Sequence, residues 1–155
     1  MLDLSETFHA EKAPNKDRMD ILEAKVAAMP QGYAPLVHRF TPGLYIREIF
    51  MPAGSIVTSR RHLTTHPFVV SQGSVEVIYE NGSTQIIDAP YSGITQAGTR
   101  RALRVIEDTI WTTFHVTDKT DPVEIENEIT ECTNPLLPNG FQQAYLGRES
   151  DLLLK

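Results

Sequence analysis

Two histidines lie four residues apart in a stretch bounded by Gly54 and Gly73. They are His62 and His66, and Arg60 stands two residues before the first of them. Neutral imidazole nitrogens bind divalent transition metals and can also exchange a proton near neutral pH. A guanidinium instead binds carboxylate or phosphate through two parallel hydrogen bonds. The stretch therefore indicates either a metal site or a pocket for a small anion.

Composition limits the class of protein that carries this stretch. The chain has 155 residues, 41% of them hydrophobic and 22% charged, which predicts one globular domain with a proper core. A net charge of −6 argues against a general nucleic-acid binder. No apolar run has the length of a membrane span, and the N-terminus lacks the apolar segment of a signal peptide. Because the single Cys132 also fits a reducing compartment, we expect a soluble, non-secreted protein without nucleic-acid or membrane partners.

A period-two pattern of β-branched and aromatic residues predicts an antiparallel sheet between residues 36 and 116. We expect strands over 36–40, 44–50, 55–62, 68–71, 74–80, 83–88, 94–96, 102–106 and 109–116. Turns are expected at Gly73, at Asn81-Gly82 and at Glu107-Asp108. Many short strands at this spacing favour a sandwich or a barrel.

Helical patterns flank the predicted sheet. The first covers residues 16–29 and packs either on the chain's own sheet or on a second subunit. Its apolar stripe consists of Met19, Leu22, Val26 and Met29. The second helix begins after Asp121, a good N-cap followed by proline, and runs to about residue 130. We therefore divide the chain into an N-terminal arm and helix, a barrel and a C-terminal helix and tail, at residues 1–34, 35–118 and 119–155.

The glycine-bounded stretch resembles the first sequence motif of the cupin superfamily, G-x5-H-x-H-x3,4-E-x6-G. Its five fixed positions are filled here by Gly54, Arg60, His62, His66 and Gly73, with every interval kept. Arginine thus replaces the first histidine of the motif, and histidine replaces the glutamate. The resemblance implies a mainly β fold, a cupin-type double-stranded antiparallel β-helix (jelly-roll barrel) with short helical extensions.

The second cupin motif, G-x5-P-x-G-x2-H-x3-N, aligns less well with residues 90–105. Gly98 matches its inner glycine, whereas Arg101 stands at the position of its histidine. Residues at three other fixed positions also differ: Pro90, Gln96 and Val105. The resemblance covers about residues 36–118.

The amino-acid sequence around these motifs is also similar to that of small cupin-type proteins of phages and prophages. This similarity is carried by residues 40–54, 89–91, 98–101 and 107–115. It implies a virion or tail component, found in the cytoplasm of a bacterial host or assembled into a virion with other virion proteins.

In metal-binding cupins the aligned positions hold one ion. Here they are Arg60, His62, His66 and Arg101, and a guanidinium cannot ligate a dication. A reduced site of His62, His66 and His115 stays open, holding one divalent transition metal of the Fe, Mn, Ni or Zn type. The alternative is that no metal binds and the histidines are hydrogen-bonded in a polar barrel mouth. Trp111 lies on the same face of its strand as His115 and is a further pocket candidate.

The arginines at ligand positions suggest a different chemistry. Arg60 and Arg101 could bind a small anion without metal. The alternative is internal ion pairing with Glu48, Glu76 or Glu107. General acid–base chemistry would need a histidine in the pocket, and the sequence shows no nucleophile motif to support an enzyme.

These observations favour a degenerate cupin that acts as a binding or assembly module, not an enzyme, and that forms a homo-oligomer. The competing hypothesis is a metal-dependent cupin enzyme of the dioxygenase or isomerase type.

Overall fold

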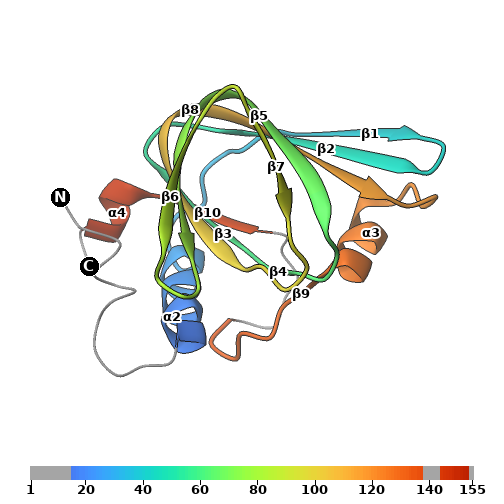
Figure 1. Ribbon diagram of the computed structural model, residues 1–155. Helices are drawn as coiled ribbons and strands as arrows, with labels where there is room; N and C mark the ends of the chain where they lie inside the picture. Colours follow the sequence, from blue (N-terminus) through green and yellow to red (C-terminus); the bar gives the residue numbers. More distant parts are fainter. Residues whose placement is uncertain (1–14, 138–143, 154–155) are drawn as a thin grey trace.

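The computed structural model describes residues 15–137 and 144–153, so the arm expected over residues 1–14 lies outside the described residues. Antiparallel strands curl into a barrel with helices packed around it (Figure 1). The strands are β1 (Leu36–Thr41), β2 (Leu44–Met51), β3 (Ser55–Ser59), β4 (Arg61–His62), β5 (His66–Tyr79), β6 (Thr84–Asp88), β7 (Tyr91–Thr95), β8 (Arg101–Val116), β9 (Thr130–Glu131) and β10 (Ala144–Arg148). The helices are α2 (Asn15–Ala27), α3 (Pro122–Ile129) and α4 (Glu149–Leu153).

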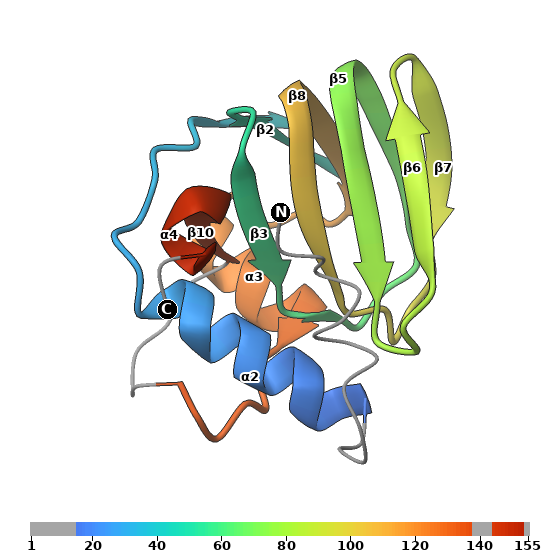
Figure 2. The same ribbon diagram turned by 90° about the vertical axis from the view of Figure 1, so that its left-hand side faces the viewer.

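The long strand β8 organises the sheet, because it pairs with β2, β3 and β5. Strand β5 in turn pairs with β6 and β7 on its other edge, and β10 joins the sheet beside β3. Figure 2 shows β3, β8 and β5 in succession, with β6 and β7 beyond them. The short pair β4–β9 forms a second sheet at one end of the barrel. The barrel predicted from the strand pattern is therefore confirmed.

Two of the expected turns are wrong, because β5 and β8 each continue through them. Gly73 lies inside β5, where the pairing with β8 shifts register between Val70 and Val75. Its φ of 94° lies in the region that glycine tolerates, which lets the strand bulge and bend without ending. Glu107 likewise stays paired with Ser74 across the bend of β8. The hairpin expected at Asn81-Gly82 is confirmed, since it joins β5 to β6.

Helix α2 covers the outer face of the barrel rather than a second subunit. All four residues of the predicted stripe are buried. They pack with Ile56 of β3, Ile78 of β5 and Ala102 of β8. These three residues alternate with inward neighbours, so they mark the outer surface of the sheet. Figure 2 shows α2 lying across this side of the barrel.

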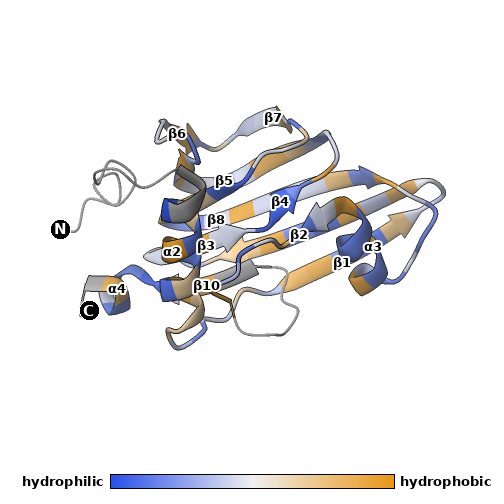
Figure 3. Ribbon diagram, turned by 90° about the horizontal axis from the view of Figure 1, so that it is seen from below, coloured by the Kyte–Doolittle hydropathy of each residue, from blue (hydrophilic) through white to orange (hydrophobic). Residues whose placement is uncertain are grey.

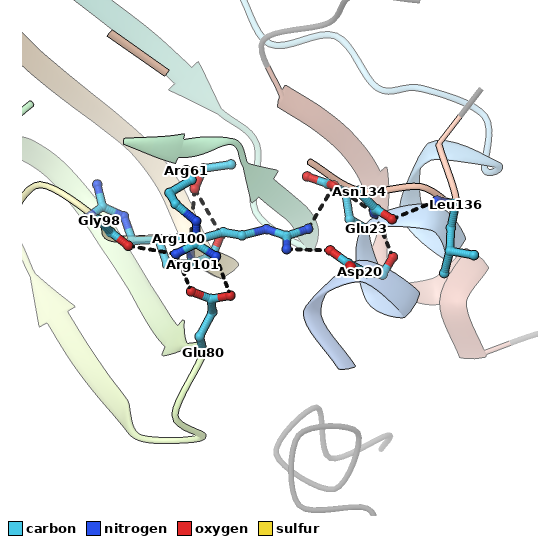
Figure 4. A network of polar contacts seen from close by, with 10 residues as sticks. Asp20, Glu23, Arg61, Glu80, Gly98, Arg100, Arg101, Asn134 and Leu136 are labelled. Atoms are coloured by element: carbon cyan, nitrogen blue, oxygen red, sulfur yellow. Dashed lines mark hydrogen bonds and ion pairs between the residues drawn. The ribbon is translucent and has the colours of Figure 1, made fainter. Parts of the chain in front are cut away.

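A buried polar network fastens α2 to the barrel (Figure 4). The Arg100 guanidinium donates to Asp20 Oδ1 at 2.5 Å and to Glu23 Oε1 at 2.9 Å. The side-chain amide of Asn134 donates to the same Glu23 oxygen at 2.9 Å. All four residues are buried, so the network joins α2, the start of β8 and the C-terminal segment in water-poor surroundings.

Helix α3 begins and ends close to its predicted bounds. The Asp121 carboxylate accepts a hydrogen bond from the Val123 backbone N–H, which is the expected N-cap. Its apolar side, Ile125 and Ile129, packs on Tyr45 of β2. Figure 3 shows hydrophobic and hydrophilic residues on different parts of this short helix. Within residues 15–137 and 144–153, no helix has the length and hydropathy needed to cross a bilayer.

Candidate functional site

Alternation along the strands brings the polar residues of interest into the barrel. On β8 the odd-numbered residues from 109 to 115 are buried, whereas their even-numbered neighbours are less so. Hydrophobic and hydrophilic residues alternate along parts of β8 (Figure 3). Inward-facing side chains of β2, β3 and β8 thereby meet at the end of the barrel that α3 covers.

These side chains enclose a cavity of about 80 Å³, here called the histidine cavity. This volume is several times what one water molecule needs. Its lining is Arg47, Ile49, Met51, Val57, Ser59, Arg60, His62, Arg101, Leu103, Trp111, Thr113, His115, Glu126, Ile129 and Thr130.

Three histidine rings form a contiguous row at this cavity. The ring centroid of His66 lies 4.9 Å from that of His62 and 4.4 Å from that of His115. His66 Nδ1 lies 3.0 Å from the Thr64 carbonyl, and His115 Nε2 lies 2.9 Å from Thr113 Oγ1. The other nitrogens of these two rings, His66 Nε2 and His115 Nδ1, are buried without a hydrogen-bond partner, as is His62 Nδ1. Because buried polar atoms are rarely left unsatisfied, the row can accept a further group from within the barrel.

The surroundings keep all three imidazoles neutral. Burial, together with the nearby Arg101 guanidinium, lowers the pKa of His62 to about 2. Burial also lowers the pKa of His115 to about 3, with smaller contributions from His66 and Arg47. For His66 burial again lowers the pKa, although the Thr64 carbonyl opposes this. Neutral rings offer one donor and one acceptor nitrogen each at physiological pH.

Fixed charge in the histidine cavity is predominantly positive. Three arginines, Arg47, Arg60 and Arg101, face a single carboxylate, Glu126 of α3. Burial raises the pKa of Glu126, whereas Arg47 and then Arg60 lower it. With the histidines neutral, the lining carries more cationic than anionic groups, which favours an anion over a dication.

Arg101 is the most unusual of these cations. It is only 6% exposed, and Nη1 donates to Thr95 Oγ1 at 3.1 Å. Its guanidinium carbon lies 5.1 Å from the Trp111 ring centroid and 5.7 Å from that of Phe68. Burial lowers its pKa to about 10. Among the described residues, no carboxylate forms an ion pair with it.

The structure brings the pocket candidates from the sequence together. Five of them line the histidine cavity, and the sixth, His66, lies between two histidines that do. Sequence reasoning missed Arg47 and Glu126. Arg47 shares its alternation with the buried Tyr45, Ile49 and Met51, which was a usable signal. Glu126 gave none, because a glutamate on a short helix is usually exposed.

Two of the three carboxylates considered as partners for these arginines pair with other arginines. Glu48 pairs with Arg39, and Glu76 pairs with Arg104. The arginines next to the ligand positions point elsewhere: Arg61 makes two hydrogen bonds to Glu80, and Arg100 belongs to the α2 network.

The three histidines supply suitable nitrogen atoms for a metal, but their arrangement does not fit one. Within the part of the chain that the structure describes, no three His, Cys, Asp or Glu side chains are placed as a ligand set. The rings form a row with His66 in the middle, and Arg101 lowers the pKa of two of them electrostatically. The described residues of this site therefore do not support a metal-dependent reaction.

Known structures share this architecture at low sequence identity. The ectoine synthase from P. lautus matches with a TM-score of 0.52 and 11% identity, over 76% of this chain and 91% of that one. A cupin superfamily protein from Desulfitobacterium hafniense has a TM-score of 0.49 and 9% identity, over 61% and 87% of the two chains. A cupin-2 domain protein from Shewanella frigidimarina has a TM-score of 0.45 and 9% identity, over 57% and 83%.

The chain has a cupin-type fold. This confirms the fold that the motif resemblance implied. At these identities the likeness concerns the fold alone. One of the proteins above is an enzyme, but a shared fold does not imply a shared function. No protein-family model and no curated protein matches the chain. The comparisons do not support the sequence similarity to phage and prophage proteins.

Proposed function

We propose that this protein is a binding module that holds a small hydroxycarboxylate in the histidine cavity without a metal. The observation that carries the proposal is that His62 and His115, each with a buried nitrogen that lacks a partner, line this cavity together with three arginines. A ligand that satisfies these atoms needs both an anionic end and a hydrogen-bond donor.

The arginines supply the anion-binding half of such a site. A carboxylate accepts paired hydrogen bonds from guanidinium groups, and these charge-assisted bonds strengthen in surroundings of low polarity. The cavity of about 80 Å³ limits the ligand to a few non-hydrogen atoms. Glu126 of α3 also lines the cavity and would repel a second negative group.

The histidine row supplies hydrogen-bond acceptors for the other end of the ligand. Since His66 Nδ1 lies 3.0 Å from a backbone carbonyl, Nδ1 carries the proton and donates. His66 Nε2 is then a lone-pair acceptor, and it is buried without a partner. Because His66 contacts His62 and His115, which line the cavity, we expect a ligand hydroxyl to reach this nitrogen and donate to it, which a plain carboxylate could not.

Calorimetric titration with glycolate and acetate, on protein freed of metal by chelator, tests this proposal. We expect glycolate to bind more tightly than acetate by roughly fivefold, the worth of one hydrogen bond. His66→Leu should bring the two affinities together. Arg60→Gln should weaken both ligands, whereas Arg39→Gln, on the exposed side of β1, should change neither.

Two results would overturn the proposal. One is stoichiometric iron, manganese, nickel or zinc in the purified protein that disappears in His66→Leu, as the metal-dependent enzyme hypothesis requires. The other is equal binding of glycolate and acetate by the unchanged protein. The homo-oligomer expected from the sequence stays a prediction.

A further inference from the structure

A second cavity, which Arg101 also lines, lies at the partly exposed side of the sheet formed by β5, β6 and β7. It is here called the tyrosine cavity and measures about 210 Å³, more than the histidine cavity. Its wall includes Phe68 and Tyr79 of β5, Gln85 of β6, Tyr91 and Thr95 of β7, and Arg101 of β8. The Phe68 ring lines this cavity and stacks at 4.6 Å on the Trp111 ring, which lines the histidine cavity.

Arg101 brings a positive charge to the tyrosine cavity. The residue lines both cavities, and its guanidinium donates to Thr95, which lines the tyrosine cavity alone. Stacking over the Trp111 and Phe68 rings holds the guanidinium in place. A buried cation with no carboxylate partner among the described residues is costly, and a bound anion would remove that cost.

The remaining wall is aromatic with hydrogen-bonding groups at the rim. The Tyr79 hydroxyl donates to Gln85 Oε1 at 3.1 Å, and Gln85 Nε2 donates to the Tyr91 hydroxyl at 3.3 Å. The Tyr91 hydroxyl therefore keeps its own proton for another acceptor. Tyr91 is 36% exposed, and its ring centroid lies 5.9 Å from that of Phe68.

A glycine keeps the two rings at this spacing. A Cβ at Gly93 would come within 2.9 Å of the Phe68 ring and 3.1 Å of the Tyr91 ring. Both rings thus occupy the space over a position without a side chain, and the Phe68 ring centroid lies 5.7 Å from the guanidinium carbon of Arg101.

We propose that the tyrosine cavity is a second ligand site, separate from the histidine cavity, which binds a small planar aromatic carboxylate. The carboxylate lies against Arg101 and Thr95, and the ring packs against Tyr91 and Phe68. Charge selects the anion, because no other described group in this wall neutralises the guanidinium. The aromatic walls select a flat body over a bulky one, since aromatic rings pair by stacking or edge contacts.

Trp111 is the only tryptophan of the chain and provides the readout. Because the Arg101 guanidinium lies 5.1 Å from its ring, a carboxylate reaching that guanidinium should change the tryptophan fluorescence. We expect saturable titration with benzoate, and no response to benzamide, which lacks the charge. Cyclohexanecarboxylate, which keeps the charge but is not flat, should bind roughly tenfold more weakly.

Variants distinguish this site from the histidine cavity. Tyr91→Leu, at the exposed rim, should weaken benzoate roughly tenfold, whereas Tyr33→Leu, 81% exposed and outside the cavity lining, is the matched control. Arg101→Gln should abolish the response. Since that buried substitution can impair folding, Thr95→Val is the milder second variant and should weaken benzoate severalfold.

Arg60→Gln separates the two proposals, because Arg60 lines the histidine cavity but not the tyrosine cavity. It should weaken glycolate and leave benzoate unchanged. The second site is refuted if benzoate gives no saturable response, or if Arg60→Gln weakens benzoate while Tyr91→Leu does not. Loss of glycolate binding alone refutes only the function proposed for the histidine cavity.

Discussion

Burial keeps the histidine row neutral, and acid should therefore cost the folded protein stability. Imidazoles in the unfolded chain titrate near pH 6.5, whereas the pKa of His115 in the folded protein is about 3 and that of His66 is also lowered. Below pH 6.5 the unfolded state thus binds more protons than the folded state. The stability associated with each neutral ring is complete above pH 6.5 and is lost as the pH falls toward the folded pKa.

We expect the free energy of unfolding to fall between pH 6 and pH 4 by about 1.4 kcal/mol per pH unit for each such histidine. Urea titrations followed by tryptophan fluorescence at several pH values measure this slope. His115→Gln should make this slope shallower by about 1.4 kcal/mol per pH unit, the contribution of one proton, because the glutamine amide does not titrate.

His38 offers the control for that experiment. It lies on β1 outside the histidine cavity and is half-buried, whereas His115 is buried; burial lowers the pKa of His38 as well. His38→Gln should change the slope less than His115→Gln. Equal slopes in the unchanged protein and in His115→Gln would show that this ring is not held neutral by the fold.

The polar network that holds α2 should contribute more to the free energy of unfolding than an exposed ion pair of similar geometry. Arg100→Gln leaves two buried carboxylates, Asp20 and Glu23, without their cation. Breaking a buried pair in this way costs about 3–5 kcal/mol, whereas exposed pairs contribute about 1 kcal/mol or less. Urea unfolding should therefore show a large loss of stability.

Arg61→Gln is the matched control, because the Arg61–Glu80 pair is bidentate but less buried. It should cost clearly less than Arg100→Gln. Similar costs for the two variants would mean that burial of the α2 network adds nothing to its effect.

The elements that sequence patterns predicted well are those defined by local chemistry. The stripe of α2, the Asp121 cap of α3 and the Asn81-Gly82 hairpin each depend on neighbouring residues, and each is present. Gly73 was misread because a glycine with positive φ serves a turn and a bulge equally well. Only pairing with β8, far along the chain, decides that β5 continues.

The site was predictable to a similar degree. Motif spacing identified Arg60, His62, His66 and Arg101, and alternation on the last strand added Trp111 and His115. The tyrosine cavity gave no signal, because its wall combines residues from β5, β6, β7 and β8. Which faces of those strands meet depends on the bends at the bulges, and these are properties of the folded sheet.

For the whole molecule, the two helices that cover the barrel are held very differently. Helix α2 shares a cluster of eight buried hydrophobic residues with the outer face of the sheet, besides its polar network. Helix α3 shares a cluster of only three, with Ile125 and Ile129 packed on Tyr45. Local opening is easiest where buried apolar contact is least, so α3 should open before the rest of the barrel.

Hydrogen exchange measured by mass spectrometry tests this difference. We expect amides of residues 123–129 to exchange well before those of residues 18–27, and Ile125→Ala to speed exchange in α3 alone. Because Glu126 and Ile129 line the histidine cavity, opening of α3 would also be the route by which a ligand enters it. Glycolate should then slow exchange in α3, while benzoate in the tyrosine cavity should not. Equal exchange of the two helices would exclude α3 as the mobile cover of the histidine cavity.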